Sequence, residues 1–417
     1  MIATALGWPN HGASQSASQS AQPEQPLPAR IVIDVDSPER DLYRIAIPDL
    51  QGSGGGPAAD VIRNDMKLVS LFNVLDPKSF IANLPQEGLG ITKPPWSSVG
   101  AQGVVKGQIG SGSVDMRFYE IARGETPLLS KTYHGGDAQI RDFMHDFANE
   151  ILRVLTGKAG SFGTRLTYTR KLGPGRKDVY VSDFDGHDQV RISQGRGIAM
   201  LPSFGALHGI WYSILSTAGM YITNTKHRER PVINSSGLNM GVSVCDGRVF
   251  FTSTRSGNSE IYSAAIDGSD VRRLTNNPAI DVSPSCGPGG QIAFVSTRHG
   301  GPQVFIMSAS GGEPKRVTYK GEHNQTPAWC PDPATPLIAF SGLQGGNFDI
   351  FTVNVKTGEY TRLTQGQGNN QDPAFSPDCR MVAFASSRGG IFISNPQGLN
   401  QNKVVSGAIS NVRWSRK

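Results

Sequence analysis

The stretch FSPDCRMVAFASSR, residues 375–388, decides the fold because its pattern recurs along the chain. A short polar turn precedes five mostly apolar residues, and small polar residues and an arginine follow. Related stretches are FFTSTR at 250–255, AFVSTR at 293–298 and AFSGLQ at 339–344. The repeated phenylalanines, spaced by 43, 46 and 44 residues, are Phe251, Phe294, Phe340 and Phe384.

A repeat of 40–50 residues with four short strands is typical of a β-propeller blade. A second strand follows each phrase, as in EIYSAAIDG, QVFIMSASGG and DIFTVNVKTG, and a short closing element ends each unit. One four-stranded sheet cannot cover both of its apolar faces, so stacked blades cover one another. The six closing elements begin at Arg191, Val232, Arg273, Arg316, Arg362 and Val404.

The first unit, residues 165–193, lacks an innermost strand, and the chain ends in an unaccompanied one, ISNVRWSRK (409–417). We therefore expect the C-terminal strand to complete the first blade, which removes exposed sheet edges. The predicted fold class is a small α/β N-terminal domain followed by a six-bladed β-propeller with C-terminal strand closure. Blade two, residues 198–234, is the most degenerate.

The region before the propeller has a different pattern. Strands are expected at RIVIDV, YRIAIPDL, AQGVVKGQI, VDMRFYEIA and LLSKTYH, and an amphipathic helix at 57–72. Apolar residues at helical spacing predict a second helix over 137–156. The predicted organisation is a disordered leader (1–29) rich in Ser, Gln, Pro and Ala, an α/β domain (30–157) and the propeller (164–417).

Composition narrows the partners. The net charge is +6, but Lys and Arg are scattered, so we expect no nucleic-acid binding. No apolar run reaches 18 residues, so any association with a membrane is expected to be indirect. The first 20 residues make a poor signal peptide, because a basic start is missing and the apolar stretch is short.

Sequence signatures of catalysis are missing. The chain has no G-x-S-x-G nucleophile elbow and no H-E-x-x-H pair. GSGGG (52–56) stands between a strand and a helix, where a phosphate loop would lie, but without G-K-[ST] we interpret it as a flexible loop. SDFDGHD (182–188) resembles part of a calcium loop, but its place between outer strands favours a hairpin turn. The expectation is no enzyme, no catalytic residue, no metal and no cofactor.

The four cysteines, Cys245, Cys286, Cys330 and Cys379, fall near the turns between the two inner strands of four successive blades. No C-x-x-C occurs, which argues against zinc or thioredoxin-like chemistry. Small apolar packing is the favoured interpretation, with a disulfide between neighbouring blades as the alternative.

The loops that lead into the inner strands share a polar pattern. They read NPAIDVSP (277–284), GEHNQTP (321–327) and GNNQDP (368–373). They meet at one end of the channel, together with the loops between the second and third strands. Short polar side chains around a concave mouth suit recognition of a partner. The alternative is that they are tight turns that satisfy backbone groups.

At this point the chain resembles the TolB family, the soluble periplasmic components of the Tol–Pal system of Gram-negative bacteria. The resemblance covers about 30–417 and is carried by RIVIDVDSPERDLYRIAIPDL, the junction LTGKAGSFGTRLTYTRK and SDFDGHDQ. It implies a periplasmic adaptor that binds the peptidoglycan-associated lipoprotein (Pal) at the propeller mouth and TolA through an N-terminal segment. Such an adaptor works with other Tol proteins, and it supports outer-membrane integrity and constriction during cell division.

The resemblance also implies site residues. The Pal site matches Asp281, Val282, Asn324, Gln325, Thr326, Asn370, Gln371 and Asp372, with a loose match near 236–239. The TolA segment matches Arg30, Ile31, Val32, Ile33, Asp34, Val35, Asp36 and Ser37. The alternative function is a carbohydrate-binding or lyase-type propeller enzyme, in which carboxylates such as Asp281 and Asp372 would face each other.

Overall fold

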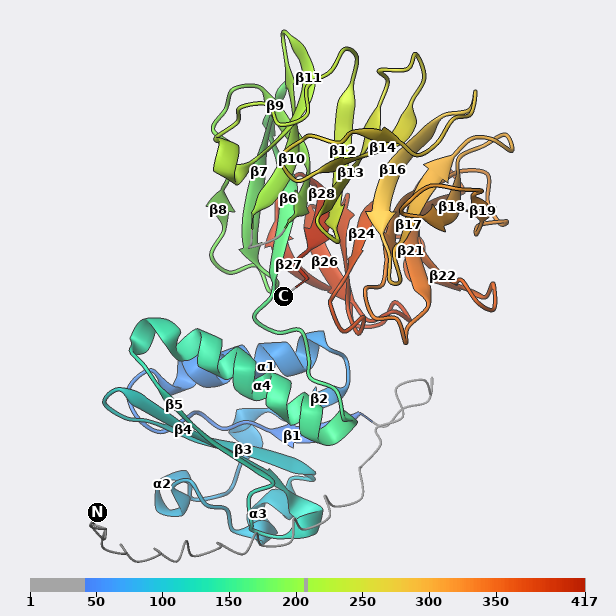
Figure 1. The fold of residues 1–417 in the computed structure, drawn as a ribbon. Helices are drawn as coiled ribbons and strands as arrows, with labels where there is room; N and C mark the ends of the chain where they lie inside the picture. Colours follow the sequence, from blue (N-terminus) through green and yellow to red (C-terminus); the bar gives the residue numbers. More distant parts are fainter. Residues whose placement is uncertain (1–41, 206–208, 417) are drawn as a thin grey trace, which may run out of the picture.

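Two parts make up the computed structural model, an N-terminal α/β domain and a β-propeller (Figure 1). The structure describes residues 42–205 and 209–416. The expected leader, the expected strand at RIVIDV and the eight residues of the TolA segment lie outside the described residues.

The N-terminal domain contains a five-stranded sheet in the order β2-β1-β3-β4-β5. β1 pairs in parallel with β2 and β3, and the β3-β4 and β4-β5 pairs are antiparallel. The strands are β1 (Tyr43–Ala46), β2 (Phe72–Val74), β3 (Gly103–Ile109), β4 (Ser113–Glu120) and β5 (Leu129–His134). The helices are α1 (Gly55–Leu68), α2 (Leu84–Glu87), α3 (Lys93–Ser98) and α4 (Ile140–Thr156), with 3-10 turns at Pro77–Ser79, Ile121–Arg123 and Asp137–Gln139.

Both long helices cover the side of this sheet that faces the propeller (Figure 1). They form where apolar residues were seen at helical spacing, and Phe147, Ile151 and Leu152 of α4 are fully buried. α2 and α3 lie on the other side and were not predicted. There Trp96 is fully buried, and the buried Glu87 accepts a bond from Lys106 Nζ at 3.0 Å.

The glycine run at 52–56 is a structural turn and the start of α1. A side chain on Gly55 would place its Cβ 1.8 Å from the Leu50 carbonyl oxygen. One on Gly52, whose φ is +95°, would meet the Ile109 carbonyl oxygen at 2.3 Å. Close backbone approach explains these glycines, so the interpretation as a flexible loop was wrong.

Six sheets of the described residues form the blades of the propeller. Blade 1 combines β28 (Ile409–Trp414), β6 (Arg165–Gly173), β7 (Arg176–Asp183) and β8 (Val190–Arg191). Blade 2 contains β9 (Ile198–Phe204), β10 (Ile210–Ser216) and β11 (Gly219–Asn224), followed by a 3-10 turn at Thr225–His227. Its fourth element is reduced to one bridge between Ile222 and Ile233, in keeping with its degenerate sequence.

The other blades are regular four-stranded antiparallel sheets. Blade 3 contains β12 (Asn239–Cys245), β13 (Arg248–Ser253), β14 (Glu260–Ala265) and β15 (Arg272–Arg273). Blade 4 contains β16 (Asp281–Cys286), β17 (Gln291–Ser296), β18 (Gln303–Ser308) and β19 (Lys315–Arg316). Blade 5 contains β20 (Asn324–Trp329), β21 (Leu337–Gln344), β22 (Asn347–Asn354) and β23 (Tyr360–Arg362), and blade 6 contains β24 (Asn370–Phe375), β25 (Val382–Ser386), β26 (Gly390–Ser394) and β27 (Asn402–Ser406).

The C-terminal strand closes the ring as predicted. β28 pairs with β6 in antiparallel register, with Ile409 opposite Arg170 and Trp414 opposite Leu166. Trp414 also donates from its indole nitrogen to Thr164 Oγ1 at 2.7 Å, immediately before β6 begins. The two ends of the propeller are therefore joined within one sheet.

The arginine of the repeated phrase has a stacking role. Arg298 lies 5.6 Å from the ring centre of Phe294 and 5.1 Å from that of Phe305, and its Nε donates to Ser296 Oγ at 2.8 Å. Arg255 in blade 3 and Arg388 in blade 6 make the same contacts with their own blades. Cation–π contacts of this kind contribute about 0.5–2 kcal/mol each. The stacking of the arginine on the phenylalanine therefore explains why the pattern Phe-x-Ser-x-Arg recurs in these blades.

The cysteines form two disulfides, so the favoured interpretation as apolar packing was wrong and the alternative is confirmed. Cys245–Cys286 joins blades 3 and 4, and Cys330–Cys379 joins blades 5 and 6. The blade-to-blade spacing brings equivalent turns side by side, with Cα–Cα distances of 6.2 and 5.8 Å. Neighbouring blades are therefore linked covalently at one end of their inner strands.

Candidate functional site

The channel mouth, where the inner strands begin, contains the residues predicted to bind a partner. The inner strands end at turns that contact the linker to the N-terminal domain, since Lys158 Nζ bonds Asp332 at 2.5 Å and Asp378 N donates to Ser161 Oγ at 2.9 Å. The inner strands therefore start at the opposite end of the channel. The loops in front of them surround an opening on the side away from the N-terminal domain.

The first residue of each of four inner strands is a buried Asn or Asp. Asn239, Asp281 and Asn370 are 0% exposed and Asn324 is 2% exposed. Asp281 accepts from Arg298 Nη2 at 2.9 Å, and Asn324 Nδ2 donates to Gln303 Oε1 at 2.8 Å. These side chains anchor the start of each strand, so three predicted site residues, Asp281, Asn324 and Asn370, belong to the framework of the mouth.

At the next position of these strands the side chains are only partly covered. Val282, Gln325 and Gln371 are each half-buried in three successive blades. Gln325 is oriented by His323, whose Nε2 lies 3.1 Å from Gln325 Oε1, while the His323 ring packs edge-on against Phe348 at 5.3 Å. These three predicted residues form one neighbouring set, which we call the mouth triplet.

The third position is a bulge in which every inner strand turns into the left-handed region. Thr326 has φ 50° and Asp372 has φ 56°, and each strand shifts register here. The other members of this bulge ring are Leu201, Gly241, Ser283 and Asn411. Sequence reasoning missed the ring, although a Gly, Ser, Asp or Asn at a fixed place in four of the six repeats was a usable signal.

The bulge ring connects the blades. Asp372 N donates to Ser341 Oγ of blade 5 at 3.1 Å, and Asn411 N donates to Asp372 Oδ2 at 2.6 Å. At the rim, Phe348 N of blade 5 donates to Asn369 Oδ1, which leads into blade 6. These bonds hold the mouth as a single rigid surface.

The two carboxylates considered for an enzyme are both engaged. Asp281 is ion-paired with Arg298, and burial raises its pKa although Ser296 and Arg298 counteract this effect. Asp372 accepts the Asn411 amide and is buried. An acid–base pair would need carboxyl groups that face a shared substrate, and these two face the framework instead.

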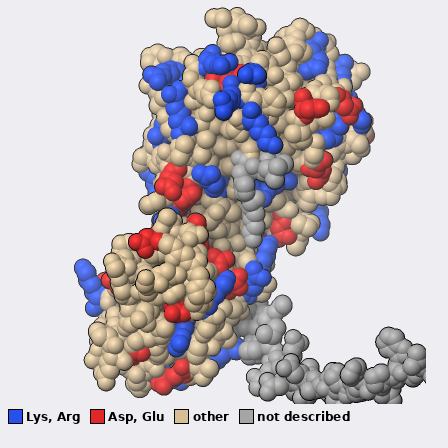
Figure 2. All heavy atoms as spheres, turned by 60° about the vertical axis from the view of Figure 1, so that its left-hand side comes forward, with Lys and Arg blue, Asp and Glu red and all other residues tan. Residues whose placement is uncertain are grey.

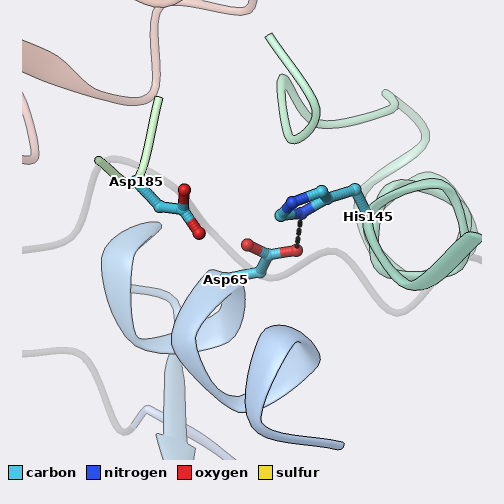
Figure 3. A group of neighbouring side chains, drawn as sticks. All are labelled: Asp65, His145 and Asp185. Atoms are coloured by element: carbon cyan, nitrogen blue, oxygen red, sulfur yellow. Dashed lines mark hydrogen bonds and ion pairs between the residues drawn. The ribbon is translucent and has the colours of Figure 1, made fainter. Parts of the chain in front are cut away.

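A second cluster lies between the domains and joins α1, α4 and the hairpin after β7 (Figure 3). His145 Nδ1 lies 2.8 Å from Asp65 Oδ2, and both side chains are buried. Asp185, from the propeller, points toward the pair and is bound by Arg141. Sequence reasoning placed Asp183, Asp185 and Asp188 in a hairpin turn, which is where they lie, but it missed the contact across the domains.

The pKa values of Asp65 and His145 depend on each other. Burial raises the pKa of Asp65 to about 6, although His145 opposes this shift. Burial alone would lower the pKa of His145, but the charge and hydrogen bond of Asp65 outweigh it and raise that pKa. One ligand atom from each of Asp65, His145 and Asp185 lies within 4.8 Å of the others. Because Arg141 already neutralises Asp185, we interpret the cluster as an ion-pair network rather than a metal centre.

The outer surface shows no dominant patch on the face drawn in Figure 2. Basic groups lie in small sets over the propeller, separated by uncharged side chains, and acidic groups are interspersed. Among the described helices, none combines the length and the apolar character that crossing a bilayer would require.

Comparison with known proteins assigns both parts. The family described as TolB beta propeller domain matches residues 152–340 and 323–416, and TolB amino-terminal domain matches 31–126. A similar curated protein is Tol-Pal system protein TolB of Anaeromyxobacter dehalogenans, 34% identical over 294 residues and 64% of each chain. Another, from Desulfosudis oleivorans, is 30% identical over 55% of this chain and 54% of its own length. The alignments thus span less than two thirds of these relatives.

A solved structure supports the fold. The crystal structure of TolB from Acinetobacter baumannii has a TM-score of 0.78 and 23% identity, and the match covers 90% of this chain and 96% of that one. At this identity the likeness is evidence for the fold alone.

Proposed function

This chain belongs to the TolB family, and from that premise we propose that it is an adaptor of the Tol–Pal system. In this proposal the propeller mouth binds the peptidoglycan-associated lipoprotein and the N-terminal segment 30–37 binds TolA. The adaptor would support outer-membrane integrity and constriction during division. The observation that carries the proposal is the mouth triplet, Val282, Gln325 and Gln371, on a rigid rim.

The proposed contacts are made by the half-exposed positions. Glutamine side chains both donate and accept hydrogen bonds, so Gln325 and Gln371 suit a polar protein surface. His323 holds Gln325 in place before binding, which reduces the entropy lost on association. Thr326 and Asp372 shape the bulge beneath them, and the buried Asp281, Asn324 and Asn370 hold the strand starts.

A periplasmic location is part of the proposal. Both disulfides suit an oxidising compartment, which the cysteine spacing alone did not reveal. The enzyme alternative is weakened because the carboxylates Asp281 and Asp372 are engaged with Arg298 and Asn411.

Calorimetric titration with the soluble domain of the lipoprotein from the same organism tests the mouth. We expect saturable binding, and we expect Gln325→Ala and Gln371→Ala each to weaken it by about tenfold or more, as hot-spot residues do. Gln397→Ala is the matched control, because Gln397 is exposed on the hairpin between β26 and β27, at the other end of the blade. Asp372→Arg is a poor probe, since it would also break the bulge ring.

Each possible result of these titrations tests a different part of the proposal. Binding that neither glutamine variant affects would remove the mouth from the proposal. No binding by a folded sample would overturn the adaptor function. Deletion of residues 30–37 should abolish binding to TolA and leave lipoprotein binding intact, and loss of both would contradict two separate sites.

A further inference from the structure

The six inner strands have an equivalent position two residues after the bulge, and one of the six differs sharply in size. Five blades place a serine or alanine there, and blade 1 places an arginine. All six line one cavity of about 500 Å³ at the end of the channel opposite the mouth. The positions are Ser203, Ser243, Ser285, Ala328, Ala374 and Arg413.

Small side chains at this level are explained by the joints between blades. Ser243 Oγ accepts from Cys286 N at 3.0 Å, and Ser285 Oγ accepts from Trp329 N at 3.3 Å. Each hydroxyl therefore lies against the next inner strand. Short side chains leave the centre of the channel open, and the one long side chain at this level is Arg413.

Arg413 lacks a counter-ion within the described part of the chain. The only hydrogen bond of its guanidinium there runs from Nη1 to the Val412 carbonyl at 2.8 Å, and no described carboxylate oxygen lies within 4.0 Å of it. Asp372 acts on it only through longer-range charge, because Asp372 Oδ2 accepts the Asn411 amide. The Arg413 side chain is half-buried and lines the cavity, so the remaining N–H donors of its guanidinium can bind a ligand there.

The surroundings suit an organic anion. Arg416 lines the same cavity and donates to the Cys286 carbonyl at 2.8 Å. Trp329 is 5% exposed, and its indole N–H has no partner among the described residues. Aromatic side chains from three further blades complete the wall: Phe204, Phe375 and Trp414.

We propose that this cavity is a binding site for a small anion that presents a carboxylate or phosphate group to Arg413. A planar guanidinium binds either group through two parallel hydrogen bonds, and the aromatic wall would cover the rest of the ligand. A cavity of this size falls within the range of small-molecule sites. The site is separate from the mouth triplet and does not depend on the proposed adaptor function.

Titration of the full chain with inorganic phosphate and with malonate, at constant ionic strength, tests the site by calorimetry and thermal unfolding. We expect at least one anion to bind saturably and to raise the unfolding temperature. Arg413→Gln should weaken binding at least tenfold. Arg413→Lys should have an affinity between those of the wild type and Arg413→Gln, because lysine keeps the charge but lacks the two parallel donors. Arg176→Gln removes the same charge from an exposed hairpin and should have no effect.

A cavity-filling variant guards against misfolding of the arginine variants. Ala328→Met narrows the cavity from blade 5 and leaves Arg413 of blade 1 in place, so it should also abolish binding in a folded protein. If phosphate binds and malonate does not, the ligand carries a phosphate group. If malonate binds and phosphate does not, the ligand carries a carboxylate. The proposal is overturned if neither anion binds the wild-type chain, or if Arg413→Gln and Ala328→Met bind as the wild type does.

Discussion

The two disulfides should supply a large share of the stability of the propeller. Cys245–Cys286 closes a loop of 41 residues and Cys330–Cys379 one of 49. In the chain-entropy account, a loop of this size removes about 4 kcal/mol of unfolded-chain freedom at 25 °C. A domain of roughly 250 residues shifts its midpoint by about 2 °C per kcal/mol. We therefore expect the paired change Cys245→Ser with Cys286→Ser to lower the unfolding temperature by about 8 °C.

The assay is thermal unfolding with and without a reductant, alongside a count of free thiols in denatured protein. The wild-type chain should show no free thiols without reductant and four free thiols after reduction. Reductant should lower the midpoint of the wild type but not that of a four-serine variant, and the two reduced midpoints should agree if the cross-links alone matter. Four thiols in the unreduced protein would refute the pairing, and a paired variant shifted by less than about 1 °C would refute the entropy argument.

Two further predictions concern buried charges. Arg298→Ala leaves the Asp281 carboxylate buried and unpaired, and should cost about 3 kcal/mol in urea unfolding. Arg255→Ala makes the same change beside the neutral Asn239 and should cost about 1–2 kcal/mol, so equal losses would contradict the charge argument. The Asp65–His145 pair takes up protons on folding because both pKa values are raised, so its stabilisation is present at low pH and is lost as pH rises from about 4 through the raised pKa of His145. The paired change Asp65→Asn with His145→Gln should flatten that decline in the unfolding midpoint between pH 5 and 8, and an unchanged profile would contradict the assignment. His145→Gln alone should not flatten it, because loss of His145 raises the pKa of the buried Asp65 further.

Much of the propeller could be predicted because its information is local and repeated. The spacing of Phe251, Phe294, Phe340 and Phe384 sets the blade period, and the unaccompanied last strand indicates the closure by β28. Each blade repeats the same balance of burial and turn chemistry, so several weak signals reinforce one another. Helices α2 and α3 carry no such repetition. They are short and are fixed by tertiary contacts such as Lys106 with Glu87, which a local pattern cannot reveal.

The sequence indicated where the candidate site residues lie in each blade, but not which of them are buried. An Asn or Asp at the start of an inner strand appears in the sequence as a polar loop residue, yet Asp281, Asn324 and Asn370 are buried. Their partners, among them Arg298 and Gln303, lie many residues away in the chain. The same limit applies to the contact of Arg141 with Asp185, which joins two domains, and to the choice of cysteine partners.

The cross-links and the mouth triplet lie within the same four successive blades, 3 to 6. Val282, Gln325 and Gln371 belong to blades 4, 5 and 6, and the disulfides join blade 4 to blade 3 and blade 5 to blade 6. Between blades 4 and 5, Trp329 fills the seam so closely that a side chain on Gly287 would meet its ring at 2.3 Å. Because each inner strand runs from the mouth to these joints, fixing the far ends limits the relative motion of the near ends. Under the proposed function, a mouth held in this way would lose little entropy when a partner binds, and the covalent links would then contribute to recognition although they lie at the other end of the channel.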